Sequence, residues 1–132
     1  MQLDKPYSIL IVDDNHCFVQ ALEALILDVA GNAIGQIDKA FNGIDGLSKI
    51  RTNHYHYIFI DINMPGLNGI QVTRIADWEL FRFGLNIIAV SYHHEEEYMT
   101  EMIKAGAKRF ISKDQINHDT IAEILNISNN SQ

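Results

Sequence analysis

Reactive side chains stand where several short apolar runs end. Asp13 and Asp14 follow the first such run, and a third carboxylate, Asp61, closes a later one. Ser91 and Lys113 follow two further runs. Three carboxylates gathered in one crevice repel each other, and this repulsion raises the pKa of at least one of them unless a cation binds. The acids therefore predict a site for a divalent metal ion, provided that their runs lie side by side.

The metal ion that best fits such a cluster is Mg²⁺, which prefers octahedral oxygen ligands at about 2.0–2.1 Å and keeps waters that a phosphoryl oxygen can replace. Carboxylates alone would also bind Ca²⁺ or Mn²⁺. The ammonium of Lys113 neutralises charge on a phosphoryl group during transfer, and the hydroxyl of Ser91 donates to a phosphoryl oxygen. Together these groups predict a phosphoryl-transfer site that works by positioning and charge neutralisation, with the carboxylate of Asp61 as nucleophile.

The elements that must position these groups are predicted from the hydrophobic pattern. Apolar runs of strand length alternate five times with amphipathic segments of helix length, which predicts a parallel sheet covered by helices on both faces. The predicted strands are Tyr7–Val12, Ile34–Phe41, Tyr57–Ile62, Asn86–Val90 and Arg109–Ile111. Parallel strands of an open sheet place their carboxyl ends on one edge, where ligands bind, so the reactive side chains are expected to meet there.

Each predicted helix carries an apolar stripe that is expected to face the sheet, and the pattern does not fix the register of the third. Three of the helices end plausibly at a glycine, namely Gly31, Gly84 or Gly106. The expected stripes, in chain order, are Phe18, Ala21, Leu22, Leu25 and Val29; Ile44, Leu47 and Ile50; Val72, Ile75, Ala76, Trp78 and Phe81; Tyr98, Met99, Met102 and Ile103; and Ile121, Ile124 and Leu125.

Length and composition describe one soluble globular domain. The chain has 132 residues, of which 47% are hydrophobic and 20% charged. Its formal charge of −7 argues against direct binding of nucleic acid, which needs a basic face. The single cysteine, Cys17, suits a reducing compartment. Neither a signal peptide nor a membrane-spanning run is evident, so we expect a cytoplasmic protein with no membrane partner.

These residues and the run DINMPGLNG resemble the receiver domains of two-component response regulators. Within that run, Asp61, Met64, Pro65, Gly66 and Gly69 match the family's spacing from phosphoacceptor through loop to third helix. The resemblance implies an α/β, flavodoxin-like, doubly wound sheet of five parallel strands in the order 2-1-3-4-5, with five helices. The predicted receiver domain spans residues 1–127, and the polar residues 128–132 form a tail or the start of a linker.

The resemblance also implies how the acidic residues act. Asp61 would accept the phosphoryl group. Asp14, Asp61 and the main-chain carbonyl of Asn63 would bind Mg²⁺, and Asp13 would act through a bound water. The phosphoryl group would come from a histidine kinase or a phosphotransfer protein in a phosphorelay. The domain would then be a phosphoacceptor that assists its own phosphorylation and dephosphorylation, and not an enzyme.

A response to phosphorylation is implied for the remaining site residues. Ser91 would bond to the phosphoryl group, Lys113 would contact it and balance its charge, and Phe110 occupies the family's aromatic switch position. A core aromatic residue would fit the position of Phe110 equally well. The output surface would lie on the fourth helix, the fifth strand and the fifth helix, and it would contact an effector protein, an effector domain absent from this chain, or a second copy in a phosphorylation-dependent homodimer.

Other interpretations were weighed against the receiver domain. Lys113 is followed by Asp114 where many receivers carry proline, and this feature resembles the receivers of NarL/LuxR-type regulators. A haloacid-dehalogenase-type phosphohydrolase would need an aspartate at Asn63, and a flavodoxin would need a phosphate-binding loop after the first strand. His93 and His94 lack the spacing of a zinc site. Whether the chain is a complete single-domain regulator or a fragment of a transcription factor stays open.

Overall fold

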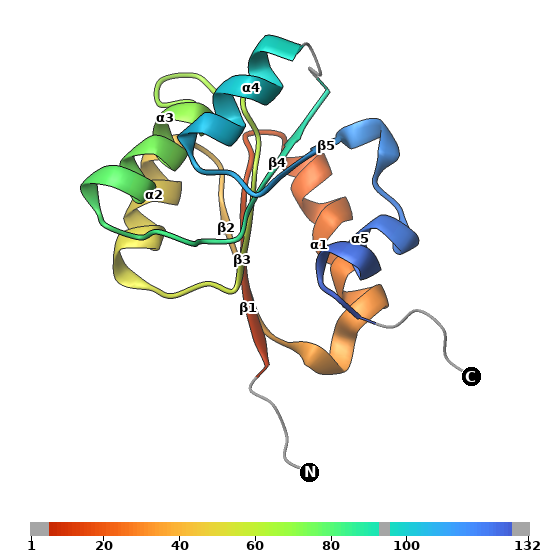
Figure 1. The fold of residues 1–132 in the computed structure, drawn as a ribbon. Helices are drawn as coiled ribbons and strands as arrows, with labels where there is room; N and C mark the ends of the chain where they lie inside the picture. The colour runs from red at the N-terminus through yellow and green to blue at the C-terminus, as the bar shows by residue number, and fades with distance from the viewer. Residues whose placement is uncertain (1–5, 93–95, 128–132) are drawn as a thin grey trace.

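The computed structural model of the chain describes residues 6–92 and 96–127 and confirms the predicted fold (Figure 1). Five parallel strands form one sheet in the order β2-β1-β3-β4-β5. The strands are β1 (Tyr7–Val12), β2 (Ile34–Ala40), β3 (Tyr57–Ile60), β4 (Ile87–Ser91) and β5 (Arg109–Ser112). The helices are α1 (His16–Ala30), α2 (Gly43–Thr52), α3 (Gly69–Arg74), α4 (Glu96–Ala105) and α5 (His118–Ile124).

Two helical layers cover the sheet. Figure 1 shows α2, α3 and α4 on one side of the strands and α1 and α5 on the other. Along β1, Leu10 and Val12 belong to the core under the first layer, whereas Ile9 and Ile11 belong to the core under the second. This alternation is the two-residue period of a strand that is buried on both faces. The central strands are therefore a rigid platform for whatever lies at their ends.

Two predicted helix stripes are displaced in the structure. In α1 the buried residues are Val19, Leu22, Ile26 and Ala30, and the predicted Ala21 is exposed. In α4 only Met102 of the predicted face is buried, while Met99 and Ile103 are exposed. Neighbouring helix positions differ by about 100°. Where apolar residues are adjacent in the sequence, the pattern alone therefore does not determine which of two neighbouring residues faces the core.

The structure fixes the register of the third helix, which the apolar pattern left open, and it leaves Trp78 and Phe81 outside the core. Val72 and Ala76 are fully buried, but the side chains of Trp78 and Phe81 are 65% and 75% exposed. After Arg74 the helix widens into a π-helical turn over Ile75–Glu79. Trp78 lies within this wider turn, which changes the direction in which its side chain points, and Phe81 lies beyond the end of the helix with a positive φ of 53°.

Main-chain hydrogen bonds fix the ends of β1 and β3 relative to each other. The amide of Asp61 donates to the carbonyl of Val12 at 2.9 Å, and the amide of Asp13 donates to the carbonyl of Ala40 at 3.0 Å. α3 starts directly beside Asp61, because Gly69 packs so closely against the Asp61 carbonyl that a Cβ atom would clash with it. Neighbouring elements therefore meet at the carboxyl end of β3.

The predictions about His93, His94 and residues 128–132 lie outside the described residues. Among the helices of residues 6–92 and 96–127, none combines the length and the apolar character that a membrane span requires.

Candidate functional site

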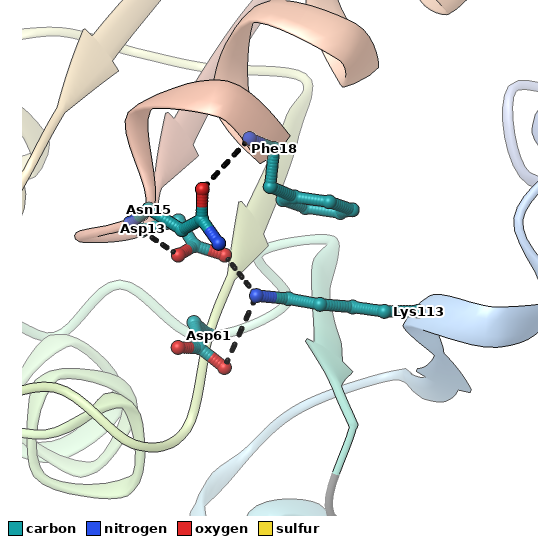
Figure 2. Close-up of polar contacts among 5 residues, drawn as sticks. All are labelled: Asp13, Asn15, Phe18, Asp61 and Lys113. Carbon is teal, nitrogen blue, oxygen red and sulfur yellow. Dashed lines mark hydrogen bonds and ion pairs between the residues drawn. The ribbon is translucent and has the colours of Figure 1, made fainter.

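Lys113 joins two of the predicted acidic residues at the carboxyl edge of the sheet (Figure 2). Its Nζ atom lies 2.8 Å from Oδ2 of Asp13 and 4.0 Å from Oδ1 of Asp61. The three side chains come from the ends of three strands, β5, β1 and β3, and at most 9% of each is exposed. The structure therefore holds two carboxylates and one ammonium together in a nearly buried cluster.

The start of α1 holds Asp13 in place from the other side. The amide of Asn15 donates to Oδ1 of Asp13 at 2.9 Å, and the side chain of Asn15 accepts from the amide of Phe18 at 3.0 Å (Figure 2). Asn15 is thus the N-cap of α1, and the residue type matches the strong preference for asparagine at that position. The helix start and the acidic cluster are built from the same few residues.

Asp14 completes a group of carboxylates that could hold a metal ion. One oxygen each from Asp13, Asp14 and Asp61 lies within 4.8 Å of the other two, and Asp14 is the exposed member. The buried Oδ2 of Asp13 contacts the ammonium of Lys113 but accepts no aligned hydrogen bond, so it retains capacity for a ligand. An all-oxygen, anionic donor set of this kind suits a hard divalent cation such as Mg²⁺.

The electrostatics of Asp61 reflect this crowding. Burial raises the pKa of Asp61, the charge of Asp13 raises it further and Asp14 adds a smaller rise, whereas Lys113 and the main-chain amide of Ile62 lower it. The result is a pKa of about 7, against an ordinary value of 3.8. A strongly raised pKa beside specific charged partners marks a candidate functional residue.

The other predicted site residues surround this cluster to different degrees. Ser91 is fully buried at the end of β4, and its strand partner on β5 is Ser112. Asn63 is exposed in the loop after β3. Phe110 is half-buried on β5 and lines a hollow of about 340 Å³ together with Met99 from α4. Phe110 thus faces a hollow between β5 and α4.

Two aromatic residues beside Lys113 have no predicted role at the site. Nζ of Lys113 lies 4.3 Å from the ring centroid of Phe18 and 5.3 Å from that of Tyr92. The hydrophobic pattern placed Phe18 in the apolar stripe of α1. Tyr92 directly follows Ser91 at the same edge of the sheet, and this position was the one available signal.

A family model described as the response regulator receiver domain matches residues 9–126. The chain is 31% identical to Protein PilH of Pseudomonas aeruginosa over 118 residues, which cover 89% of this chain and 93% of that protein. It is 34% identical over 123 residues to the hybrid signal transduction histidine kinase L of Dictyostelium discoideum, covering 89% of this chain and 7% of the kinase. The chain spans about half the length of other curated relatives that it matches.

A solved structure with the same fold is the receiver domain of a sensor histidine kinase from Pseudomonas aeruginosa, with a magnesium ion coordinated in its active site cleft. It superposes with a TM-score of 0.75 at 24% identity and covers 91% of this chain and 94% of the solved one. At that identity the likeness shows the fold alone.

Proposed function

The chain belongs to the family of response regulator receiver domains, and on that premise we propose that Asp61 accepts a phosphoryl group beside a bound Mg²⁺. Receiver domains of this family are generally signalling domains and not enzymes. The observation that carries the proposal is the buried cluster of Asp13, Asp61 and Lys113, in which the pKa of Asp61 is raised to about 7. Repulsion between the neighbouring carboxylates destabilises the cluster when no cation is bound, and a bound cation relieves that repulsion.

The metal ion would be held by oxygens of Asp14 and Asp61 and by the main-chain carbonyl of Asn63, with Asp13 acting through a bound water. The donor set supports this assignment, since one oxygen of each acid lies within 4.8 Å of the others. A solved receiver domain with the same fold holds a magnesium ion in its active site cleft, which agrees with a cation site in this fold. When bound, the ion would neutralise the carboxylates and the incoming phosphoryl oxygens.

The proposed reaction moves a phosphoryl group from nitrogen to oxygen. A carboxylate oxygen of Asp61 forms a bond to phosphorus, while the bond from phosphorus to the donor nitrogen breaks and its electron pair returns to the donor imidazole. The donor is a phosphohistidine of a histidine kinase or phosphotransfer protein. Nζ of Lys113, 4.0 Å from Oδ1 of Asp61, is placed to contact the arriving phosphoryl oxygens.

The proposed response involves Ser91 and Phe110. Phosphorylation adds a charge of roughly −2 and strong acceptor oxygens. Ser91 would donate to these oxygens, and its movement would reach β5 through the paired residues Ser91 and Ser112. The hollow of about 340 Å³ beside Phe110 supplies space for that ring to change position. The output face would comprise α4, β5 and α5, which would contact an effector protein, a further domain or a second copy.

Intact mass after treatment with a small phosphodonor tests the acceptor assignment. We expect a gain of one phosphoryl group that requires Mg²⁺ and is absent in Asp61→Asn, because an amide cannot replace the attacking carboxylate. Asp45→Asn is a matched control, since Asp45 is an exposed acid on α2. Phosphorylation of Asp61→Asn at the level of the unchanged chain would overturn the assignment.

Ser91→Ala tests the response separately from acceptance. The variant should still be phosphorylated, more slowly, because Ser91 is not the nucleophile. Amide hydrogen exchange with and without a phosphoryl mimic should show changes across α4, β5 and α5 in the unchanged chain and smaller changes in Ser91→Ala. A full response in the variant would remove Ser91 from the switch. A response confined to α1 and α2 in the unchanged chain would refute the output face.

A further inference from the structure

The ammonium of Lys113 has two kinds of neighbour, carboxylates on one side and aromatic rings on the other. Figure 2 shows the ring of Phe18 beside the lysine side chain, with Asp13 and Asp61 at its tip. The ring centroids of Phe18 and Tyr92 lie 4.3 Å and 5.3 Å from Nζ. Phe18 belongs to the first turns of α1, whereas Tyr92 directly follows β4. Two separate elements therefore bring a ring to the same ammonium.

Both distances fall within the range of about 6 Å at which an aromatic face attracts a cation. This attraction is stronger where water is excluded, and only 5% of the Lys113 side chain is exposed. A lysine side chain is flexible and ends in a compact charge, so its position depends on what surrounds it. The rings attract the ammonium without offering an anion that would bind it rigidly.

That difference matters for the proposed reaction. In the present structure Lys113 is held most closely by Asp13, at 2.8 Å, and less closely by Asp61, at 4.0 Å. A phosphoryl group on Asp61 would bring its oxygens close to Nζ, and these oxygens would compete with Asp13 for the ammonium and draw it a short distance from the first carboxylate toward the second. A cation that moves over aromatic faces keeps their attraction through a small displacement, whereas it loses a directional ion pair.

We propose that Phe18 and Tyr92 are positioning residues that hold the Lys113 ammonium beside Asp61 while it moves from Asp13 to the phosphoryl group. The inference rests on the proposed function, since it assigns the rings a role in that transfer. Neither ring would touch the reacting atoms, because both act through Lys113. The rings also occupy space from which water would otherwise screen the ammonium.

Tyr92 gives the cleaner test of the two. Phe18 also packs against the core between α1 and the sheet, so its replacement disturbs the fold as well as the lysine. The side chain of Tyr92 is 56% exposed, and its loss removes little buried surface. Tyr92→Leu deletes the aromatic face, and Tyr92→Phe retains it. The comparison of these two variants separates the ring from the hydroxyl and from side-chain bulk.

The experiment measures the phosphorylation rate with a small phosphodonor at saturating Mg²⁺. Tyr92→Leu should be slower than the unchanged chain by a factor of about 2 to 30, the range expected for loss of one cation–π contact. Tyr92→Phe should restore the rate. In a Lys113→Met background, Tyr92→Leu should cause no further loss, because the ring then has no cation to hold. Mg²⁺ affinity should be the same in the Tyr92 variants.

Each result decides the inference. If the unchanged chain is phosphorylated and Tyr92→Leu is phosphorylated at the same rate, the positioning role is overturned and the proposed function stands. An equal loss in the Lys113 and Lys113→Met backgrounds also overturns it, since the ring would then act independently of the lysine. Absence of phosphorylation in the unchanged chain overturns the proposed function, and the inference with it.

Discussion

Asp61 and Asp38 are both aspartates shielded by the same sheet, yet their pKa values shift in opposite directions. Asp61 lies among other acids, and its pKa rises to about 7, mainly because it is buried and secondly because of Asp13. Burial also raises the pKa of Asp38, but hydrogen bonds from Gln36 and Tyr55 and the charge of Lys49 together outweigh it, so the pKa of Asp38 is lowered. Burial raises the pKa of both residues, and the neighbours decide whether that rise is reinforced or reversed.

The hydrogen-bond donors around Asp38 indicate that this residue stabilises the fold. Nε2 of Gln36 donates to both carboxylate oxygens at 2.9 Å, and the hydroxyl of Tyr55 donates to Oδ2 at 2.5 Å. This last bond ties β2 to the chain just before β3. A carboxylate supplied with donors stabilises its charged form and the fold. A carboxylate supplied with other carboxylates, like Asp61, destabilises the free fold until a ligand binds, and such sites are candidates for function.

The largest effect that should separate the two residues is the pH dependence of stability in metal-free protein. Because the folded pKa of Asp61 lies above its unfolded value of 3.8, its contribution to stability is present below pH 3.8 and is lost as pH rises through about 7. Each unit of pKa difference corresponds to about 1.4 kcal/mol, and solvent screening reduces the full value, so the loss should be a few kcal/mol.

Asp61→Asn should therefore be more stable than the unchanged chain at pH 8, and the advantage should shrink toward pH 4. Urea unfolding in the presence of a chelator, repeated from pH 4 to pH 8, measures the free energy of unfolding of the variant and of the unchanged chain. The exposed Asp45→Asn is the matched control and should follow the unchanged chain. Parallel curves for Asp61→Asn and the unchanged chain would mean that Asp61 is not crowded in solution.

Mg²⁺ should offset the crowding at Asp61. At one hundred times its dissociation constant, the ion should stabilise the folded chain by about 2.7 kcal/mol. Asp14→Ala should lose most of this gain at the same Mg²⁺ concentration, because it removes one of the three clustered carboxylates. Its stability without metal should rise, since a like charge is gone. A metal-free Asp14→Ala that is less stable, with unchanged Mg²⁺ affinity, would contradict the proposed site.

Tyr55→Phe should destabilise the fold, because it removes the hydrogen bond from the Tyr55 hydroxyl to the carboxylate of Asp38. Loss of a hydrogen bond to a charged acceptor costs about 2 kcal/mol. The folded pKa of Asp38 is lowered, so its stabilisation is present above pH 3.8 and is lost as pH falls through the folded value. The cost should consequently be larger at pH 7 than at pH 3. Tyr7→Phe is the control, because its hydroxyl donates to a main-chain carbonyl at 3.4 Å, and it should cost less.

The smallest effect should come from an exposed ion pair. Nζ of Lys39 lies 3.0 Å from Oε1 of Glu23, and 39% of the lysine side chain is exposed. Lys39→Met should change the free energy of unfolding by less than about 1 kcal/mol, because water and salt screen such pairs. Denaturation in low and high salt should show this. A larger, salt-independent cost would mean that exposure is a poor guide to the strength of charge pairs in this fold.

The sequence predicted the sheet because its signals are local. Strands buried on both faces are continuous apolar runs, and parallel strands end on one edge, so the sequence predicts that Asp13, Asp61 and Lys113 meet there. The functions assigned to these residues remain predictions. Boundaries shifted by one or two residues, as at Ile62, which was predicted to end β3 and instead lies beyond it.

Features that depend on contacts between distant segments were not predictable. Asp38 and Tyr55 are 17 residues apart, and no local pattern pairs them. The contact of Phe18 with Lys113 requires the start of α1 to lie against the end of β5. The exposed Trp78 lies within a π-helical turn, which alters the helical period and has no distinctive composition.

The exposed position of Trp78 has a consequence for spectroscopy. It is the only tryptophan of the chain, and 65% of its side chain is already in contact with solvent in the folded state. The emission wavelength of an indole depends on its exposure to solvent, so an indole that is exposed both before and after unfolding changes its emission wavelength little. Tryptophan fluorescence would therefore under-report unfolding of this domain, and circular dichroism of its helices is the more sensitive signal for the denaturation experiments.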